Sequence, residues 1–380
     1  MPIALRGCLA LSDFLGDFVV YRRLEPADQR LPGLPVLAAE LGLEPGRIPR
    51  KTELDYARVV ASIFRSAARL TGRPRTLRRL VAIGDTRMND VSAFRNLCEV
   101  TGWQGLAVIC SERLEEPAKL EEAEPGVFLA NRWRILGELP QLAASHGIAL
   151  DESTAVVIDI DKTAIGARGR NDAQIDAARV EGVRRTAAAM LGGNYNEQAF
   201  LEAYHYLHPA PFHPFTADNQ DYLVYIALAI AAGLYSLEEI VQRVRSGELR
   251  SFAQFIEEVN ARTDDLAGSM LAPVHAEVYP RFIAGDPTPF KTFRRHEFRA
   301  TIERMGCLNG EPDPAVAMRS EIVLTWEVVQ LTRHLQALGA TVIGISDKPD
   351  EAAVPGPADR DDGYPALHRA ASHCLGEDLA

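Results

Sequence analysis

The chain has 380 residues, of which 47% are hydrophobic and 24% charged, a composition typical of a globular protein with room for two or three domains. Its formal net charge of −11 argues against a protein that binds nucleic acid through a broad basic face. The 5 cysteines are scattered and include no Cys-x-x-Cys pair. We therefore expect neither a disulfide framework nor a structural zinc site, and a cytoplasmic location.

The sequence also predicts no contact with a membrane. Its N-terminus lacks the basic segment and long apolar stretch of a secretory signal. The most apolar run, residues 222–235, is 14 residues long, whereas a helix that crosses a bilayer needs roughly 20. This run predicts a buried helix.

The first half of the chain predicts strands and helices in alternation. Residues 1–45 have no clear pattern, and they could extend a core, cover a site or join subunits of a homo-oligomer. Residues 53–70 have helical periodicity, with Thr52 as the expected N-cap. The apolar run 80–83 predicts a buried strand that ends at Gly84-Asp85. A helix at about 90–100, a strand at 105–110, a helix at about 132–145 and a strand at 155–158 are expected to follow.

Residues 164–319 are predominantly helical in pattern. Helices are expected at 172–191, 197–207, 221–235, 237–245 and 251–261. Residues 321–338 then predict a helix that stops at Gly339, and residues 341–345 predict a third buried strand. Alternating strands and helices on both sides of a helical block predict an α/β fold. We expect a Rossmann-like parallel sheet formed by residues 46–163 and 320–380, with an all-helical domain inserted at 164–319.

Polar clusters follow three of the predicted strands. Asp159-Ile-Asp161-Lys-Thr163 follows the strand at 155–158, Gly84-Asp85 with Asn89 and Asp90 follows the strand at 80–83, and Ser346-Asp-Lys348 follows the strand at 341–345. Reactive groups of a parallel sheet gather where strands end and helices begin. Each cluster alone could consist of helix caps or loop acids, but their joint occurrence indicates one site.

These clusters resemble the motifs of the haloacid dehalogenase superfamily. The segment Asp159–Thr163 matches the first motif of that family, an apolar strand followed by Asp-x-Asp-x-Thr. Ser346 matches the second motif, a strand that ends in Ser or Thr. The segment Gly84–Asp90 matches the fourth motif, Gly-Asp with a second acid four or five residues later.

The order of these motifs differs from that of the family, because the candidate fourth motif precedes the first. A circular permutation with its break between the second motif and the third, a lysine, would explain this order. The missing lysine should then lie before Asp85 at the start of a helix. Lys51 lies there, directly before the helix expected at 53–70. Lys348, two residues after Ser346, is the alternative.

The resemblance implies a role for each candidate residue. Asp159 would be the nucleophile that forms an aspartyl-phosphate, and Asp161 would be the general acid and base. Ser346 and Lys51 would bind the phosphoryl oxygens. The metal ligands would come from Asp159, Asp161 with its backbone region, Asp85, Asp90 and Asn89, which together suit Mg²⁺. Thr163, Lys348, Arg168 and Arg170 are further candidates for contact with the substrate.

The resemblance thus implies a Mg²⁺-dependent phosphatase of a small phosphorylated metabolite, with the helical domain as a cap that closes over the site. A phosphotransferase or phosphomutase, and a catalytically inactive binding or regulatory protein with the same fold, remain alternatives. Asp161-Lys-Thr163 also resembles the start of the Asp-Lys-Thr-Gly-Thr motif of P-type ion pumps, but Ala164-Ile165 replaces its Gly-Thr. His205, His208 and His213 are interpreted as structural or substrate-lining residues.

Overall fold

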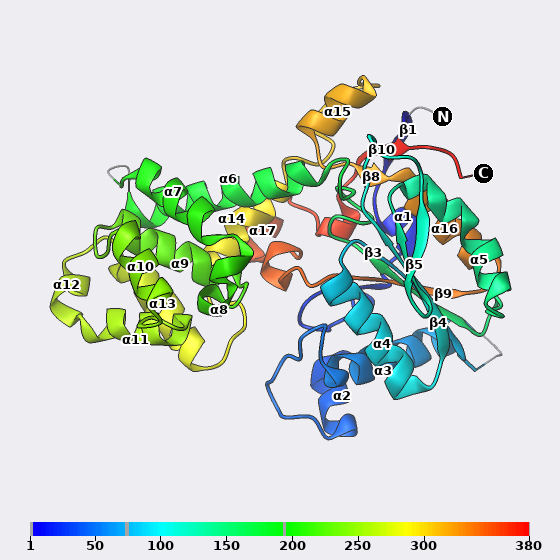
Figure 1. Cartoon of the computed structure of the whole chain (residues 1–380), viewed down its shortest axis with the longest axis horizontal. Helices are drawn as coiled ribbons and strands as arrows, with labels where there is room; N and C mark the ends of the chain where they lie inside the picture. Colours follow the sequence, from blue (N-terminus) through cyan, green and yellow to red (C-terminus); the bar gives the residue numbers. More distant parts are fainter. Residues whose placement is uncertain (1–2, 73–75, 193–194, 380) are drawn as a thin grey trace. The chain divides into compact units, whose positions relative to one another are not determined.

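A computed structural model describes residues 3–72, 76–192 and 195–379. The chain forms two compact units (Figure 1). Residues up to Ala178 together with those from Thr301 onward form the core unit, and Arg179–Ala300 form the helical unit. Among the described residues, no helix is both long and apolar enough to cross a membrane.

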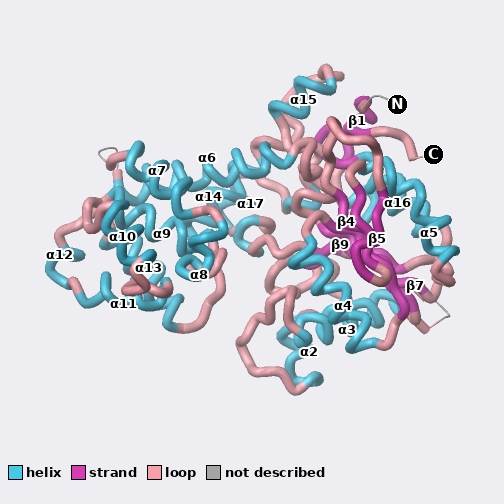
Figure 2. The backbone as a smooth tube through the Cα atoms, in the orientation of Figure 1, coloured by secondary structure: helices cyan, strands magenta, loops and turns pink. Residues whose placement is uncertain are grey.

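The main sheet of the core unit has seven strands in the order β2-β9-β7-β3-β4-β6-β5 (Figure 2). All neighbouring strands are parallel except β5, which runs antiparallel to β6. The predicted α/β class with a mostly parallel sheet is therefore confirmed. The strand bounds are β2 Val19–Val20, β3 Arg79–Gly84, β4 Gln104–Cys110, β5 Leu120–Glu124, β6 Val127–Ala130, β7 Thr154–Asp159 and β9 Thr341–Ile345.

The strand β7 lies at the centre of the three strands that end in polar clusters. It pairs with β3 on one side and with β9 on the other, in parallel register. All residues of β7 and β9 are buried, as expected for parallel strands covered on both faces. The prediction that the strands ending near 85, 159 and 346 are neighbours, with the one at 159 central, is confirmed.

Helices cover both faces of this sheet. Figure 1 shows α3 (Leu54–Leu70) and α4 (Ser92–Thr101) on one side, and α5 (Leu139–Ser145) and α16 (Trp326–Ala337) on the other. The apolar stripe of α3 packs with α4 and the sheet in one buried cluster, which is what the 3.6-residue period of its sequence requires. Shorter helical pieces of the core unit are a π-helical turn at Arg87–Val91, a 3₁₀ turn at Trp133–Glu138, α15 Pro314–Ser320, 3₁₀ turns at Asp350–Ala352 and Leu367–Arg369, and α17 Pro357–Asp361.

Two predicted helix starts are wrong. The N-cap of α3 is Glu53, not Thr52, and no side chain caps this helix. The helix expected at 321–338 begins only at Trp326, because Leu324–Thr325 form the short strand β8. The Thr325 hydroxyl donates a hydrogen bond to the Thr163 carbonyl at 2.6 Å, so this strand is tied to the turn after β7.

The described part of the N-terminal segment belongs to the core unit. Strand β2 pairs with β9 at the edge of the main sheet. Strand β1 (Ala4–Leu9) forms a second, three-stranded sheet with β10 (Ser372–Gly376) and β8. The helices α1 (Ser12–Leu15) and α2 (Leu34–Leu41) connect these strands to the rest of the unit. The described residues of this segment, 3–45, thus extend the core.

The helical unit contains the helices that the sequence predicted and several that it did not. α6 (Asp172–Leu191), whose first turns belong to the core unit, α7 (Glu197–Leu207), α10 (Leu237–Arg245) and α11 (Phe252–Ala261) lie close to the predicted ranges. α9 covers Gln220–Ala231, where a helix was expected at 221–235. The helices not predicted are α8 His213–Thr216, α12 Thr263–Ala267, α13 Ala272–Ile283 and α14 Lys291–Ile302, with a 3₁₀ turn at Ala210–Phe212. The helical unit spans fewer residues than the insert expected at 164–319, because residues 164–178 and 301–319 belong to the core unit.

Within the helical unit, α6 and α14 cross at a glycine. A Cβ atom on Gly182 would lie 2.6 Å from the backbone of Glu297, so only glycine permits this approach. A Gly→Ala change inside an unobstructed helix usually stabilises it by about 1 kcal/mol. We expect Gly182→Ala instead to destabilise the protein by about 1–3 kcal/mol, because the crossing must open. Urea unfolding followed by circular dichroism measures the loss.

The matched control is Gly268→Ala, where the nearest atom to the new Cβ would be 3.8 Å away. This change should leave the unfolding midpoint nearly unaltered. Stabilisation by Gly182→Ala would contradict the close helix crossing.

Candidate functional site

Three buried carboxylates converge at the ends of β7 and β3. Asp85, Asp90 and Asp159 each offer an oxygen atom, and these atoms lie within 4.8 Å of one another. Asp159 is the last residue of β7 and Asp85 directly follows β3. The parallel pairing of these strands therefore brings the two side chains to the same edge of the sheet.

Asp90 reaches this carboxylate group from the π-helical turn after β3. Its Oδ2 atom accepts hydrogen bonds from the backbone N–H groups of Asp85 at 3.0 Å and Thr86 at 2.8 Å. A Cβ atom on Gly84 would lie 2.4 Å from the same oxygen. The glycine of the Gly-Asp pair is therefore required by the position of the Asp90 side chain.

Lys51 holds two of the three carboxylates together. Its Nζ atom donates to Asp90 Oδ1 at 2.5 Å and to Asp159 Oδ1 at 2.8 Å, and all three side chains are buried. Lys348, the alternative lysine, lies 3.9 Å from Asp161 Oδ1 instead. The structure thus brings Lys51 to Asp159, and Lys348 to Asp161.

Burial and the charges of the neighbouring groups shift the pKa values of these carboxylates. Burial, reinforced by Asp90 and Asp85, raises the pKa of Asp159 well above its ordinary value although Lys51 opposes the shift. Burial and Asp90 raise the pKa of Asp85 to about 6. For Asp90, burial acts in the same direction, but Lys51 and two backbone amides hold its pKa below the ordinary value.

Lys51 is the fixed positive charge of the site. Burial disfavours its ammonium, but Asp159 and Asp90 together raise its pKa well above the ordinary value. It therefore stays charged at neutral pH.

The carboxylate group of Asp85, Asp90 and Asp159 could hold a metal ion. Its oxygen donors are the kind that hard cations such as Mg²⁺ prefer. No other group of three His, Cys, Asp or Glu residues with this spacing occurs in the described part of the chain. Two expected ligands lie outside the group of Asp85, Asp90 and Asp159. Asp161 Oδ1 lies 3.9 Å from Lys348 Nζ, and Asn89 is half-buried on the π-helical turn.

Some residues of the first and second motifs lie at the carboxylate group, and others lie in the turns that follow β7 and β9. Lys162 adopts a left-handed φ of 62°, and the Ala164 N–H donates to the Asp159 carbonyl at 3.3 Å, so the chain turns back after β7. Thr163 is fully buried in this turn. Ser346 is also buried at the end of β9, where its hydroxyl accepts from the Lys348 N–H at 3.0 Å.

The two arginines beyond the first motif have different surroundings. The Arg168 Nε atom donates to Asp85 Oδ2, so this side chain contacts the carboxylate group. Arg170 is buried between Glu112 and Glu327, with contacts of 2.5 Å and 2.9 Å. Its guanidinium is engaged by these two carboxylates inside the core unit, so the structure gives no support to the substrate contact expected of Arg170.

Sequence reasoning missed several residues around the site. Tyr56 is fully buried in α3, its charged neighbours include Lys51 and Asp159, and burial raises the pKa of its hydroxyl. Glu112 lies two residues after β4, and this fourth strand end is a signal that could have identified it. Glu327 lies within the helix expected at 321–338, so its position in the sequence does not indicate a role at the site.

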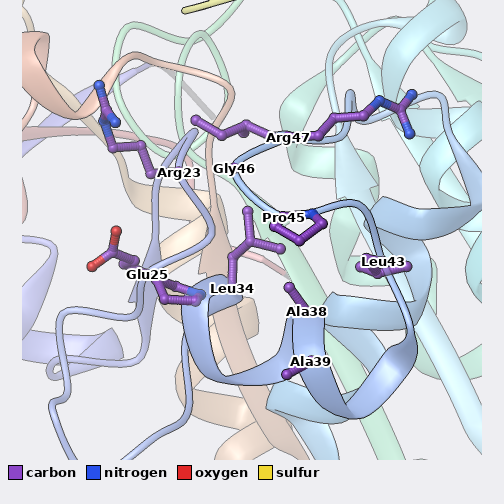
Figure 3. Close-up of a pocket in the computed structure, with 11 residues that line it drawn as sticks. Arg23, Glu25, Leu34, Ala38, Ala39, Leu43, Pro45, Gly46 and Arg47 are labelled. Carbon is purple, nitrogen blue, oxygen red and sulfur yellow. The ribbon is translucent and has the colours of Figure 1, made fainter.

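The histidines of the helical unit and the cavity of the N-terminal segment lie outside this site. His213 Nε2 lies 3.2 Å from the His208 carbonyl oxygen, and neither histidine belongs to the carboxylate group. A cavity of about 410 Å³ lies beside α2 (Figure 3). Its mostly apolar wall includes Arg23 and Arg47, which pair with Glu351 and Glu53, and no expected site residue lines it.

Comparison of the chain with models of known protein families found no match. Searches of curated proteins and of solved structures found no match either.

Lys51→Met should destabilise the protein by about 3–5 kcal/mol at pH 7.5, because it leaves buried carboxylates without their cation. The loss should shrink at pH 5, where protonation of Asp85 and Asp159 removes negative charge. Urea unfolding at both pH values measures it. Lys119→Met, at a side chain that is 65% exposed, is the control and should have little effect. Equal stability of Lys51→Met and wild type at pH 7.5 would refute the charge argument.

Metal binding should weaken as the pH falls, because protons and the metal ion compete for Asp85 and Asp159. With the pKa of Asp85 at about 6, the affinity for Mg²⁺ should drop about tenfold or more between pH 6 and pH 5. Isothermal titration calorimetry with MgCl₂ alone measures this dependence. An affinity that does not change over this range would exclude these carboxylates as the ligands.

Proposed function

We propose that this protein is a Mg²⁺-dependent phosphatase that resembles the haloacid dehalogenase superfamily in a circularly permuted form. Its substrate would be a small phosphorylated metabolite. The observation that carries the proposal is the position of Asp159. This residue ends β7, the middle one of the three strands that end in polar clusters, contacts Lys51 at 2.8 Å and forms a carboxylate group with Asp85 and Asp90. The strand order β9-β7-β3 supports the permuted reading, because it makes neighbours of three motifs that lie far apart in the chain.

The charges of the site suit a metal ion and a phosphate ester together. The four carboxylates of Asp85, Asp90, Asp159 and Asp161 face the three cations of Lys51, Lys348 and Arg168. Full ionisation leaves an excess of negative charge that would repel a phosphate. Asp85, Asp90 and Asp159 would hold Mg²⁺, which when bound neutralises charge on the phosphoryl oxygens.

In the proposed reaction Asp159 is the nucleophile and Asp161 is the general acid and base. A carboxylate oxygen of Asp159 attacks phosphorus, and the bond between phosphorus and the ester oxygen breaks. Asp161 donates its proton to that leaving oxygen, then accepts a proton from the water that attacks the aspartyl-phosphate. Inorganic phosphate leaves and Asp159 is restored. Lys51 supports the first step because its ammonium favours the ionised form of Asp159.

Other residues of the core unit would position the phosphoryl group. Ser346 and Lys51 are proposed to bind its oxygens, as the resemblance implies. Lys348 lies 3.9 Å from Asp161 Oδ1 and is proposed as a further contact of the phosphoryl group. The helical unit follows the first motif in the chain, and we propose it as the cap that selects the substrate.

Asp159→Asn should lower kcat toward p-nitrophenyl phosphate with Mg²⁺ by on the order of 10³-fold or more, because the amide is a poor nucleophile. Asp161→Asn should lower it by about 10²–10⁴-fold through loss of proton transfer. Release of p-nitrophenol and of inorganic phosphate measures turnover, and equal amounts of both distinguish hydrolysis from transfer to another acceptor.

The control for this experiment is Asp264→Asn, at an exposed position of the helical unit, which should retain wild-type turnover. Wild-type rates for Asp159→Asn would disprove its role as nucleophile. Absence of turnover by the wild type, on this ester and on a panel of phosphorylated metabolites, would disprove the phosphatase.

A further inference from the structure

The loop at residues 166–171 presents Arg168 to the carboxylate group from a rigid backbone. The Arg168 N–H donates to the Lys162 carbonyl at 2.8 Å. The Arg168 carbonyl accepts from the Glu112 N–H at 2.9 Å and from the Trp133 indole N–H at 3.2 Å. Three hydrogen bonds thus fix the peptide groups on both sides of this residue.

The residues after Arg168 anchor the loop to the core unit. A Cβ atom on Gly169 would lie 2.1 Å from the Glu112 carbonyl oxygen, so the two backbones are in direct contact. The Arg170 guanidinium binds both Glu112 and Glu327. The Asn171 side-chain amide donates to the carbonyls of Met318 and Glu321 and accepts from the Val323 N–H. These contacts hold the backbone of the loop on both sides of Arg168.

The Arg168 side chain is partly exposed to solvent. It is 33% exposed, whereas its partner Asp85 is 6% exposed. Its Nε atom donates a hydrogen bond to the Oδ2 atom of Asp85, and Asp85 is one of the three carboxylates that could hold a metal ion. A guanidinium and a divalent cation that meet at one carboxylate repel each other and compete for its oxygens.

We propose that Arg168 and the metal ion compete for Asp85. Once the metal ion is bound, the Arg168 guanidinium leaves Asp85 and binds the phosphoryl group of the substrate. This inference rests on the proposed function and assigns Arg168 a second partner. Guanidinium binds phosphate oxygens in pairs through its planar fork of N–H donors. The exposed side chain can turn toward such a ligand while the loop stays in place, so metal binding prepares the site for phosphate.

Titration of Arg168→Ala tests the competition. Removal of the guanidinium should tighten binding of Mg²⁺ about tenfold, since Asp85 loses a competing cation. Inorganic phosphate, titrated in saturating Mg²⁺, should bind about tenfold or more weakly to the variant, and Arg168→Lys should restore only part of this affinity. Isothermal titration calorimetry of the full chain measures both affinities without any need for turnover.

Lys162→Ala is the matched control, because it removes a cation of the same segment that pairs with Asp176 and not with the carboxylate group. Its affinities should remain within about twofold of wild type. Circular dichroism establishes that each variant is folded. Equal or weaker Mg²⁺ binding by Arg168→Ala would overturn the competition, and unchanged phosphate binding would overturn the transfer of the guanidinium to phosphate.

The outcome is separable from that of the phosphatase assay. Tighter Mg²⁺ binding and weaker phosphate binding by Arg168→Ala, in a wild type that hydrolyses no ester, would support the role of Arg168 and refute the phosphatase. Turnover by the wild type with unaltered affinities in Arg168→Ala would support the phosphatase and refute the role of Arg168.

Discussion

The contact of the Lys51 ammonium with Asp159 and Asp90 is the interaction on which the site depends. Like charges as close as these buried carboxylates repel strongly in a medium of low polarity. Lys51 offsets part of that repulsion, but Lys51 and Arg168 are two cations in contact with three carboxylates. The fold thus concentrates negative charge that it does not fully neutralise within the protein. A divalent cation would relieve this excess, which links the stability of the core unit to metal binding.

The fold supports this charged edge with a second buried ionic group. Arg170 lies between Glu112 and Glu327, and Glu327 also accepts from the Glu377 N–H at 2.9 Å. A buried ion group of this kind adds little net stability compared with apolar packing, but it specifies one arrangement of the segments that it joins. Here it fixes the loop that carries Arg168 against the ends of the sheet. The helical unit contains a comparable group, in which Arg294 pairs with Asp221 and Glu297.

The arrangement of the sheet shows how distant segments come to share one edge. Parallel strands point their carboxyl ends in the same direction, so the neighbours β9, β7 and β3 bring Ser346, Asp159 and Asp85 together although they occur in another order in the chain. Their site is thus compatible with any order of the strands along the chain that preserves their order in the sheet. The N-terminal segment adds β2 beside β9 and so completes the sheet at that edge.

The sequence by itself determined the α/β class, the three buried strands and the acidic residues at their ends, because burial on both faces produces continuous apolar runs. It also predicted Lys51 from the order of the motifs. Only the tertiary structure decided that Asp90 belongs to the carboxylate group with Asp85 and Asp159 while Asp161 does not. It likewise separated Arg168 from Arg170, which are alike in sequence, since direction and burial come from the packing of the loop against Glu112 and Glu327. Local patterns record periodicity and burial, whereas the pairing of charges depends on segments that lie far apart in the chain.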